Sequence, residues 1–172
     1  MSERRVALVT GASRGIGRAI AEQLIADGFF VVGTATTEKG AAAIGDALGE
    51  NGAGKMLNVA EKASVDETLK SINDEFGAPL VLVNNAGGIF ANRQESADGF
   101  EMTFALNHLS YFVLTLELLD LLRAAPAARI VNVASKAHVG AKMDFDDLEF
   151  RNGYHARNAY CLLYTSDAAD DA

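Results

Sequence analysis

A glycine-rich segment near the amino terminus has the residue types and the spacing that can hold a phosphate group. In TGASRGIG, residues 10–17, Gly11 permits a sharp exit from a strand, Gly15 lets backbone N–H groups approach a pyrophosphate, and Gly17 lets helix and sheet pack closely. The amino end of the helix that follows adds partial positive charge. The spacing G-x3-G-x-G departs from the common G-x-G-x-x-G fingerprint, and an ordinary strand-to-helix turn is the alternative interpretation. Its position at the first strand–helix junction of an alternating pattern favours a nucleotide cofactor.

The residues after the second expected strand bear on which nucleotide is bound. An acid at the end of that strand would bond the ribose 2′-OH of NAD and would repel the 2′-phosphate of NADP. The sequence there is GTATTEK, which is neutral through Thr36 and Thr37. Glu38 is either a ribose partner or a first-turn acid favoured by the helix dipole, whereas Arg14 in the glycine segment offers positive charge to a phosphate. The prediction is therefore NADP(H), with NAD(H) as the alternative.

Other polar residues do not combine into a site. The segment DFDDLE, residues 144–149, places four carboxylates together but lacks the ligand spacing and the glycine turn of a calcium loop, so we expect a solvated loop. His108, His138 and His155 are widely separated, and Cys161 is the single cysteine. These residues predict neither a disulfide nor a metal site.

The composition fits one soluble domain. The 172 residues are 49% hydrophobic, which allows a sizeable core, and carry a formal net charge of −8. An acidic chain without a basic run argues against nucleic acid or an anionic membrane as a partner. The start MSERRVALVTG enters a strand without the apolar stretch of a signal peptide, and we expect no apolar run of the roughly 18 residues that span a membrane. A cytoplasmic protein is therefore predicted.

Apolar runs alternate with helical patterns along the chain. Strands are expected at residues 6–10, 29–35, 55–59, 79–85 and 129–135, and helices at residues 16–25, 38–48, 64–76 and 99–122. Strands that are apolar on both faces, each followed by a helix, predict a parallel sheet covered on both sides. The expected fold class is α/β, a Rossmann-like doubly wound parallel sheet that is truncated after the fifth strand.

A set of short motifs resembles the short-chain dehydrogenase/reductase family. The motifs are TGASRGIG, VNNAG at residues 83–87, Asn107 in LNH, NVAS ending at Ser135, and Tyr160. The resemblance covers residues 5–160 and implies an NAD(P)-dependent oxidoreductase whose sheet begins with the order 3-2-1-4-5. It implies that Tyr160 passes a proton to or from the substrate oxygen, that Ser135 orients this oxygen, and that Asn107 fixes a water in the proton relay. The nicotinamide carries the hydride.

The same resemblance implies further cofactor contacts. Asn58 and Val59 would contact the adenine, and Asn85, Ala86 and Gly87 would line the cofactor. The complete predicted cofactor set is Gly11, Ser13, Arg14, Gly15, Ile16, Gly17, Thr36, Asn58, Val59, Asn85, Ala86 and Gly87. Ordinary structural interpretations stand beside the three catalytic assignments: a serine that ends a strand, an asparagine bonded within its helix, and a surface tyrosine.

The family also places a lysine four residues after the catalytic tyrosine, where it lowers the pKa of the phenol and holds the ribose. A free tyrosine has a pKa of about 10 and needs a neighbouring cation to exchange protons near neutral pH. This chain has Tyr164 at that position. Residues 161–172 resemble a translated sequencing adapter, so we expect a non-native tail after Tyr160. We also expect the 172-residue chain to be inactive.

The two halves of the chain resemble different branches of the family. Residues 1–87, with VALVTGASRGIGRAIAEQL, are similar to bacterial 3-oxoacyl-[acyl-carrier-protein] reductases. Residues 88–160, with RIVNVASKAHVGAKMDFDDLEF, are similar to retinol-dehydrogenase-like reductases. The change falls near residues 83–88, within a motif that both branches share. We therefore expect residues 1–160 to form one NAD(P)-binding domain with a join of two genes there, made in sequence assembly or in a natural hybrid.

Three functions follow as hypotheses. The first is NADP(H)-dependent reduction of a carbonyl to an alcohol in fatty acid biosynthesis, on a small-molecule or acyl-carrier-protein-bound substrate. The second is a retinol-dehydrogenase-like oxidoreductase, and the third is a nucleotide-binding fragment without catalysis. The resemblance implies that an intact family member is a homo-oligomer.

Overall fold

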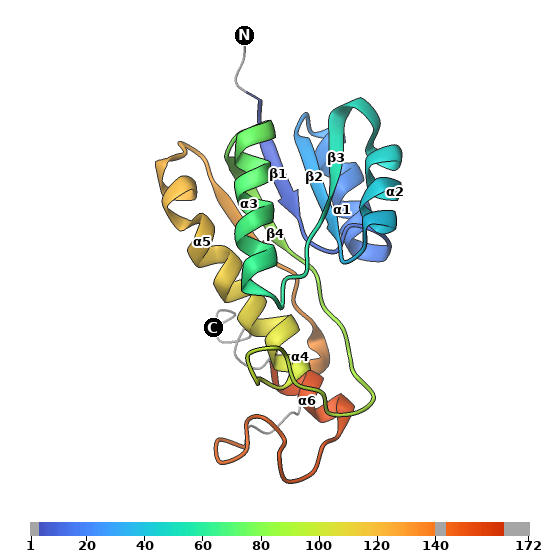
Figure 1. Ribbon diagram of the computed structural model, residues 1–172, viewed down its shortest axis with the longest axis vertical. Coiled ribbons are helices and arrows are strands. Elements are labelled where there is room, and N and C mark those ends of the chain that lie inside the picture. Colours follow the sequence, from blue (N-terminus) through green and yellow to red (C-terminus); the bar gives the residue numbers. More distant parts are fainter. Residues whose placement is uncertain (1–3, 140–143, 164–172) are drawn as a thin grey trace.

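The computed structural model describes residues 4–139 and 144–163, so the predictions that concern Tyr164 and the remaining tail lie outside the described residues. Its sheet has 5 strands in the order β3-β2-β1-β4-β5, and every neighbouring pair is parallel (Figure 1). The strands are β1 (Val6–Val9), β2 (Phe30–Ala35), β3 (Gly52–Met56), β4 (Pro79–Asn84) and β5 (Arg129–Asn132). This order confirms the Rossmann-like α/β fold that the alternating pattern predicted.

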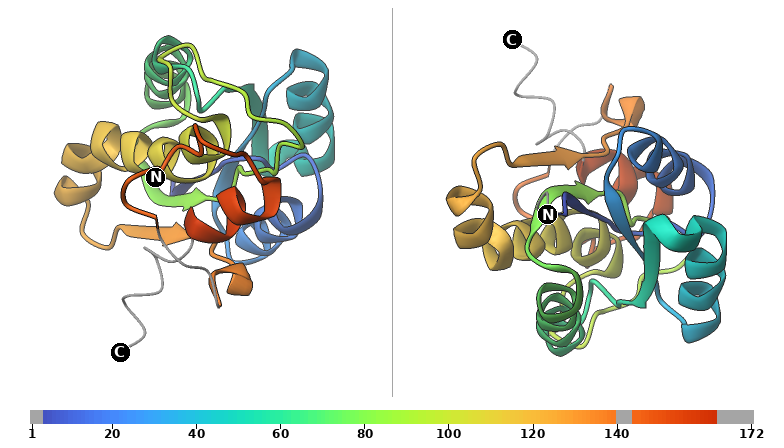
Figure 2. Two further views of the ribbon diagram at one scale, coloured as in Figure 1. Left: turned by 90° about the horizontal axis from the view of Figure 1, so that it is seen from below. Right: turned by 90° about the horizontal axis from the view of Figure 1, so that it is seen from above.

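Helices cover both faces of this sheet. The helices α1 (Gly15–Ala26) and α2 (Glu38–Leu48) lie on one face, and α3 (Lys62–Phe76) and α5 (Ser110–Ala124) lie on the other (Figures 1 and 2). The shorter helical elements are η1 (Gly49–Asn51), α4 (Met102–Phe104), the π-helical turn η2 (Ala105–Leu109), η3 (Lys136–His138) and α6 (Ala156–Leu163). Of these, α6 was not predicted from the sequence.

The central strands are hydrophobic because both of their faces are covered. All four residues of β1 are fully buried, and alternate β1 side chains enter two separate hydrophobic clusters. Val6 and Leu8 pack with α3 and α5, whereas Ala7 and Val9 pack with α1 and α2. The continuous apolar run of β1 therefore reports burial on both sides, as expected for a parallel sheet.

The winding of the chain reverses at β1 and leaves a crevice at the carboxyl edge of the sheet. The chain moves outward from β1 to β2 and β3 on one side, and then to β4 and β5 on the other. Val9, the last residue of β1, lies opposite Gly33 of β2 and Val83 of β4. Connections that leave a strand pair in opposite directions make a ligand site at that edge in open α/β sheets.

One helical stretch runs continuously from Met102 to Ala124 through α4, η2 and α5. It is long and apolar enough to cross a membrane by length and composition alone, with a mean hydropathy of 1.3. The expectation that no apolar segment would be long enough to span a membrane is therefore wrong. The stretch places Leu114, Leu118 and Leu122 in the core beneath the sheet, and a buried core helix of a soluble protein passes the same test.

Two strands differ by more than one residue from the sequence-based prediction. The third strand was expected at residues 55–59 but lies at Gly52–Met56, because its glycines allow α2 to pack directly on its backbone. A Cβ atom on Gly54 would lie 1.8 Å from the carbonyl oxygen of Ala41 in α2. The fifth strand ends at Asn132 rather than at residue 135, and its four residues are exposed.

Candidate functional site

The glycine segment joins β1 to α1 at the carboxyl edge of the sheet. Gly11 and Gly15 have positive φ values of 66° and 56°, a backbone conformation that glycine adopts without steric cost. A Cβ on Gly17 would lie only 2.4 Å from the Gly11 carbonyl oxygen and from Nδ2 of Asn85. The segment therefore turns tightly, brings the amino end of α1 to the crevice and leaves no room for a side chain at Gly17.

The end of β4 holds this segment in place. The backbone N–H groups of Asn85 and Ala86 donate to Oγ1 of Thr10 over 2.9 and 3.0 Å. Nδ2 of Asn85 donates to the carbonyl oxygens of Thr10 and Gly11 over 2.9 and 3.2 Å. The sequence signals TGASRGIG and VNNAG, about 75 residues apart, are thus parts of one structural unit.

A cavity of about 560 Å³ opens above this unit, within the 300–1,000 Å³ usual for small-molecule sites. Its walls are Gly11, Ser13, Arg14, Gly15, Ile16, Gly17, Thr34, Ala35, Thr36, Leu57, Val59, Asn85, Ala86, Gly87 and Leu106. Every predicted cofactor residue except Asn58 is among them. Arg14 is the single charged side chain of this lining, so the cavity combines a guanidinium with the positive end of a helix dipole.

Asn58 lies between two residues of the cavity wall, but its side chain forms hydrogen bonds within the turn that precedes α3. Its Nδ2 donates to Glu61 over 2.7 Å, and its Oδ1 accepts from the Ala60 N–H over 3.2 Å. Its backbone N–H donates to Oγ of Ser64 at 3.0 Å. Asn58 thereby organises the entry to α3, which places Leu57 and Val59 against the cavity.

Four wall residues were missed by the sequence analysis, namely Thr34, Ala35, Leu57 and Leu106. Thr34 and Ala35 could have been found by the argument that singled out Thr36, because all three follow one another at the end of β2. The positions of Leu57 and Leu106 depend on where β3 ends and where η2 lies, and no motif marks them.

Asn107 joins the long helix to the loop after β4. It is 2% exposed and lies in the π-helical turn η2. Its Nδ2 donates to the carbonyl oxygens of Thr103 and Gly88 over 2.8 and 2.9 Å, and its Oδ1 accepts from the Gly88 N–H over 2.9 Å. A Cβ on Gly87, a residue of the cavity wall, would lie 2.5 Å from the same oxygen. The predicted relay asparagine thus adjoins the cavity and fixes its rim.

Ser135 and Tyr160 lie on segments that meet beside this rim, although neither is among the residues of the cavity wall. Ser135 follows β5, and its Oγ accepts from the Ala137 N–H over 3.2 Å at the start of η3. Tyr160 is half-buried in α6, and this helix packs against both η3 and α4. The fold therefore brings the serine segment, the tyrosine helix and the helix before Asn107 to one end of the molecule.

The loops at this end are tied together by residues that the sequence analysis did not identify. The Tyr154 hydroxyl donates to the Phe90 carbonyl oxygen over 2.9 Å and lies 3.1 Å from Oγ1 of Thr103. Arg93 donates from Nη1 to Glu95 over 2.7 Å and from Nε to the Glu149 carbonyl oxygen over 3.1 Å. The hydrogen bond with Glu95 raises the pKa of Arg93, and the same bond lowers the pKa of Glu95. These ties connect the loop after β4 to the segment that enters α6.

The acidic segment at residues 144–149 takes part in this loop structure. Asp147 accepts hydrogen bonds from the backbone N–H groups of Asn152 and Arg151, both over 2.8 Å, and these bonds lower its pKa. Within the described part of the chain, no three His, Cys, Asp or Glu side chains are grouped as metal ligands.

Comparisons with known proteins agree with the motifs. The family model described as short chain dehydrogenase matches residues 5–144. The 3-oxoacyl-[acyl-carrier-protein] reductase of Vibrio harveyi is 65% identical over 85 residues, which are 49% of this chain and 35% of that protein. The reductase of the same name from Vibrio cholerae is 48% identical over 139 residues, 77% of this chain and 55% of that protein.

A relative from the second branch covers more of the chain. Retinol dehydrogenase 13 of Homo sapiens is 37% identical over 163 residues, which are 91% of this chain and 49% of that protein. Both resemblances seen in the motifs are thereby confirmed. The chain spans between about a third and about half of the length of these relatives.

Proposed function

Because the chain belongs to the short-chain dehydrogenase family, we propose that it derives from an NADP(H)-dependent oxidoreductase that interconverts a carbonyl and an alcohol. The observation that carries this proposal is the cavity at the carboxyl edge of the sheet. The glycine segment and the amino end of α1 meet there beside Arg14, and no acid is among the lining residues. Backbone N–H groups and a guanidinium suit a pyrophosphate and a ribose 2′-phosphate.

The side chains around this cavity fit a bound nicotinamide nucleotide. When bound, the reduced cofactor supplies a hydride to the carbonyl carbon. In this proposal Tyr160 donates a proton to the carbonyl oxygen, Ser135 orients that oxygen by a hydrogen bond, and Asn107 positions a water of the proton relay. The half-buried positions of Ser135 and Tyr160, on segments that pack together, support these roles.

For the substrate, we propose a 3-oxoacyl group carried by an acyl-carrier protein, because the Vibrio harveyi reductase that bears this name is 65% identical over 85 residues. The alternative is a small or lipophilic carbonyl, which is favoured by the wider coverage of the match to retinol dehydrogenase 13. We place the change between the two resemblances near residues 83–88. A cytoplasmic location and a homo-oligomeric intact enzyme belong to the same proposal.

The cofactor part of the proposal is tested by titrating the purified chain with NADPH and NADH. We expect tighter binding of NADPH, because Arg14 and the neutral end of β2 accept the 2′-phosphate. Thr36→Asp adds an acid at the cavity wall and should shift the ratio of the two dissociation constants towards NADH by about tenfold. Lys39→Gln, which removes an exposed charge on α2, is the matched control and should leave the ratio unchanged. Tighter binding of NADH by the unaltered chain would contradict the proposal.

The catalytic part is tested by assaying NADPH oxidation with a 3-oxoacyl thioester and with an aliphatic aldehyde. We expect little or no turnover with either, because Tyr164 stands in place of the family lysine and supplies no ammonium group to assist proton transfer. A chain that binds NADPH without turnover agrees with the nucleotide-binding-fragment alternative for this sequence. Robust oxidation would show that the lysine is dispensable, and the preferred substrate would then distinguish the two branches.

A further inference from the structure

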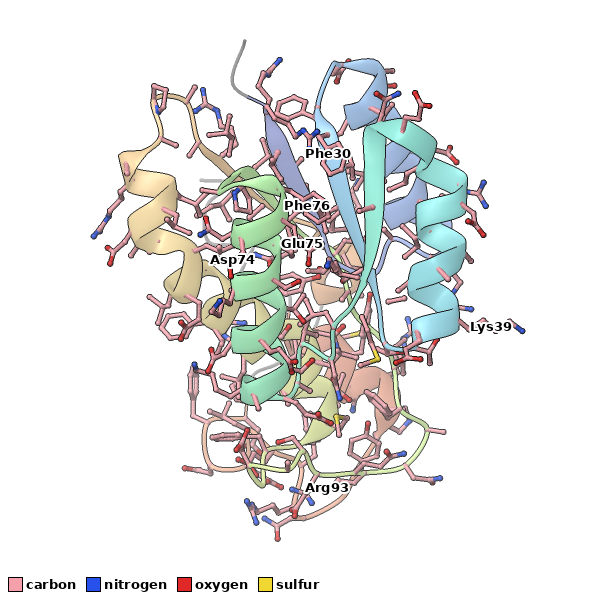
Figure 3. The ribbon with its side chains drawn as sticks, turned by 45° about the horizontal axis from the view of Figure 1, so that its top comes forward. Phe30, Lys39, Asp74, Glu75, Phe76 and Arg93 are labelled. Atoms are coloured by element: carbon pink, nitrogen blue, oxygen red, sulfur yellow. The ribbon has the colours of Figure 1, made fainter. Side chains whose placement is uncertain are left out.

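A second cavity lies at the opposite, amino edge of the sheet and has a volume of about 480 Å³. Four segments meet there: the entry to β1, the end of α3, the start of β4 and the end of α5. Their lining residues are Arg4, Arg5, Phe76, Gly77, Ala78, Leu80, Leu121, Ala124, Ala125 and Pro126. Figure 3 shows Phe30 and Phe76 side by side at this end, with Arg93 of the site loops at the other. The cavity is therefore separate from the proposed cofactor site.

The composition of the cavity is that of a site for a small amphiphile. Eight of its ten lining residues carry no polar side chain, and Leu121 is 37% exposed within it. Its volume falls within the range of small-molecule sites, which are mostly apolar with a few polar groups that fix orientation. Here the polar groups are the guanidinium groups of Arg4 and Arg5.

Both guanidinium groups rest on aromatic rings. The Arg4 guanidinium lies 4.4 Å from the centroid of Phe30, and the Arg5 guanidinium lies 4.0 Å from the centroid of Phe29. Phe30 in turn contacts Phe76, with 5.1 Å between the ring centroids. Cation–π contacts of this kind position a guanidinium while leaving its N–H donors available to a ligand.

Neither arginine is neutralised by a carboxylate among the residues that the structure describes. The two acids in the last turn of α3 are engaged elsewhere, since Asp74 pairs with Lys70 and Glu75 pairs with Lys55. The cavity thus gathers two guanidinium groups that have no carboxylate partner among the described residues, in a chain whose net charge is −8.

The helix ends at the cavity do not cancel this charge. The carboxyl ends of α3 and α5 contribute partial negative charges of about half a unit each. Against two full positive charges, these leave a net charge of about +1 at the cavity. An anionic head group is therefore favoured there, and a planar carboxylate or a phosphate matches the fork of a guanidinium.

We propose that this cavity binds a small anionic amphiphile, with a carboxylate or phosphate on Arg4 and Arg5 and a short apolar tail against Leu80, Leu121 and Pro126. The site is independent of the nucleotide site, because it lies at the other edge of the sheet and shares no lining residue with it. The ligand is recognised by its anionic group and its apolar tail together. Acetate lacks the tail and octanol lacks the charge, so neither should bind as well as octanoate.

The test is a calorimetric and NMR titration of the 172-residue chain with octanoate and with octyl phosphate. We expect saturable binding of at least one of them, with a dissociation constant at or below about 1 mM, and chemical-shift changes centred on Gly77, Ala78 and Ala125. The Arg4→Gln/Arg5→Gln double variant should weaken binding about tenfold or more, because it removes charge-assisted hydrogen bonds. Acetate and octanol should bind more weakly than octanoate, and added salt should weaken octanoate binding.

Two further variants distinguish a specific loss of the binding site from a general loss of the folded structure. Ala124→Glu adds an acid at an exposed position of the cavity rim and should weaken octanoate binding while thermal unfolding stays cooperative. Lys39→Gln, whose side chain points away from the molecule in Figure 3, should leave octanoate binding unchanged. No saturation with either amphiphile would overturn the proposal, as would equal affinity of the double variant or shifts centred on the glycine segment. The proposed NADPH site lies at the other edge of the sheet. If NADPH failed to bind, the result of the octanoate titration would therefore still stand.

Discussion

At the scale of single residues, Gly17 is the position where backbone packing and the proposed nucleotide site meet. A Cβ there would lie 2.4 Å from the Gly11 carbonyl oxygen and from Nδ2 of Asn85, which is itself bonded to Thr10 and Gly11. We expect Gly17→Ala to reduce the free energy of unfolding by about 1–3 kcal/mol, as overpacking does, and to weaken NADPH binding. Urea unfolding and an NADPH titration measure the two effects.

A second glycine provides the control for this substitution. A Cβ on Gly45 of α2 would make an ordinary contact, 3.5 Å from the Gly54 nitrogen. Gly45→Ala should therefore leave NADPH binding intact and stabilise the helix by up to about 1 kcal/mol. If Gly17→Ala were as stable and bound NADPH as tightly as the unaltered chain, the close packing described for the glycine segment would not matter for its function.

At the scale of elements, Asn107 connects the π-helical turn to the loop after β4. Asn107→Ala would leave both backbone polar groups of Gly88 and the Thr103 carbonyl oxygen without these partners. Because an unsatisfied buried group costs about 1–3 kcal/mol, we expect the variant to lose at least about 2 kcal/mol of unfolding free energy. Amide exchange at Gly88 should also become faster.

The exposed Asn92 lies in the same loop and provides the matched comparison. Asn92→Ala should change stability by less than about 0.5 kcal/mol, as surface substitutions usually do. Equal effects of the two variants would show that the Asn107 hydrogen bonds are not what holds the loop. The conclusion that Asn107 holds the loop after β4 to the π-helical turn would then be wrong, whether or not Asn107 also takes part in a proton relay.

At the scale of the whole molecule, the sequence predicted what depends on local pattern and missed what depends on contacts between elements. The apolar run of β1 and the glycine segment can be recognised in the sequence, because burial on both faces and a tight turn each restrict the residue types that fit. Gly52–Met56 carries no such pattern, since its strand conformation is fixed by β2 beside it and α2 above it. Tyr154 and Arg93 were missed for the same reason: their partners lie 64 and 56 residues away in the sequence.

The exposed edge of the sheet has consequences for the molecule as a whole. Among the described residues, β5 pairs with β4 alone, and its Ile130 and Val131 are 40% and 45% exposed. An apolar unpaired edge is a template for pairing with another chain, and a charged side chain, lysine above all, blocks such pairing. We therefore expect the chain to self-associate as its concentration rises, and Val131→Lys to shift it towards the monomer in sedimentation velocity.

The control for the edge is Leu148→Lys, which adds the same charge to a loop residue that is 50% exposed. This variant should associate like the unaltered chain, because a loop offers no ladder of free N–H and C=O groups to a second strand. NADPH should bind both variants alike, since neither residue lines the nucleotide cavity. If Leu148→Lys suppressed association as strongly as Val131→Lys, general charge repulsion would explain the result, and β5 would not be the site of contact between chains.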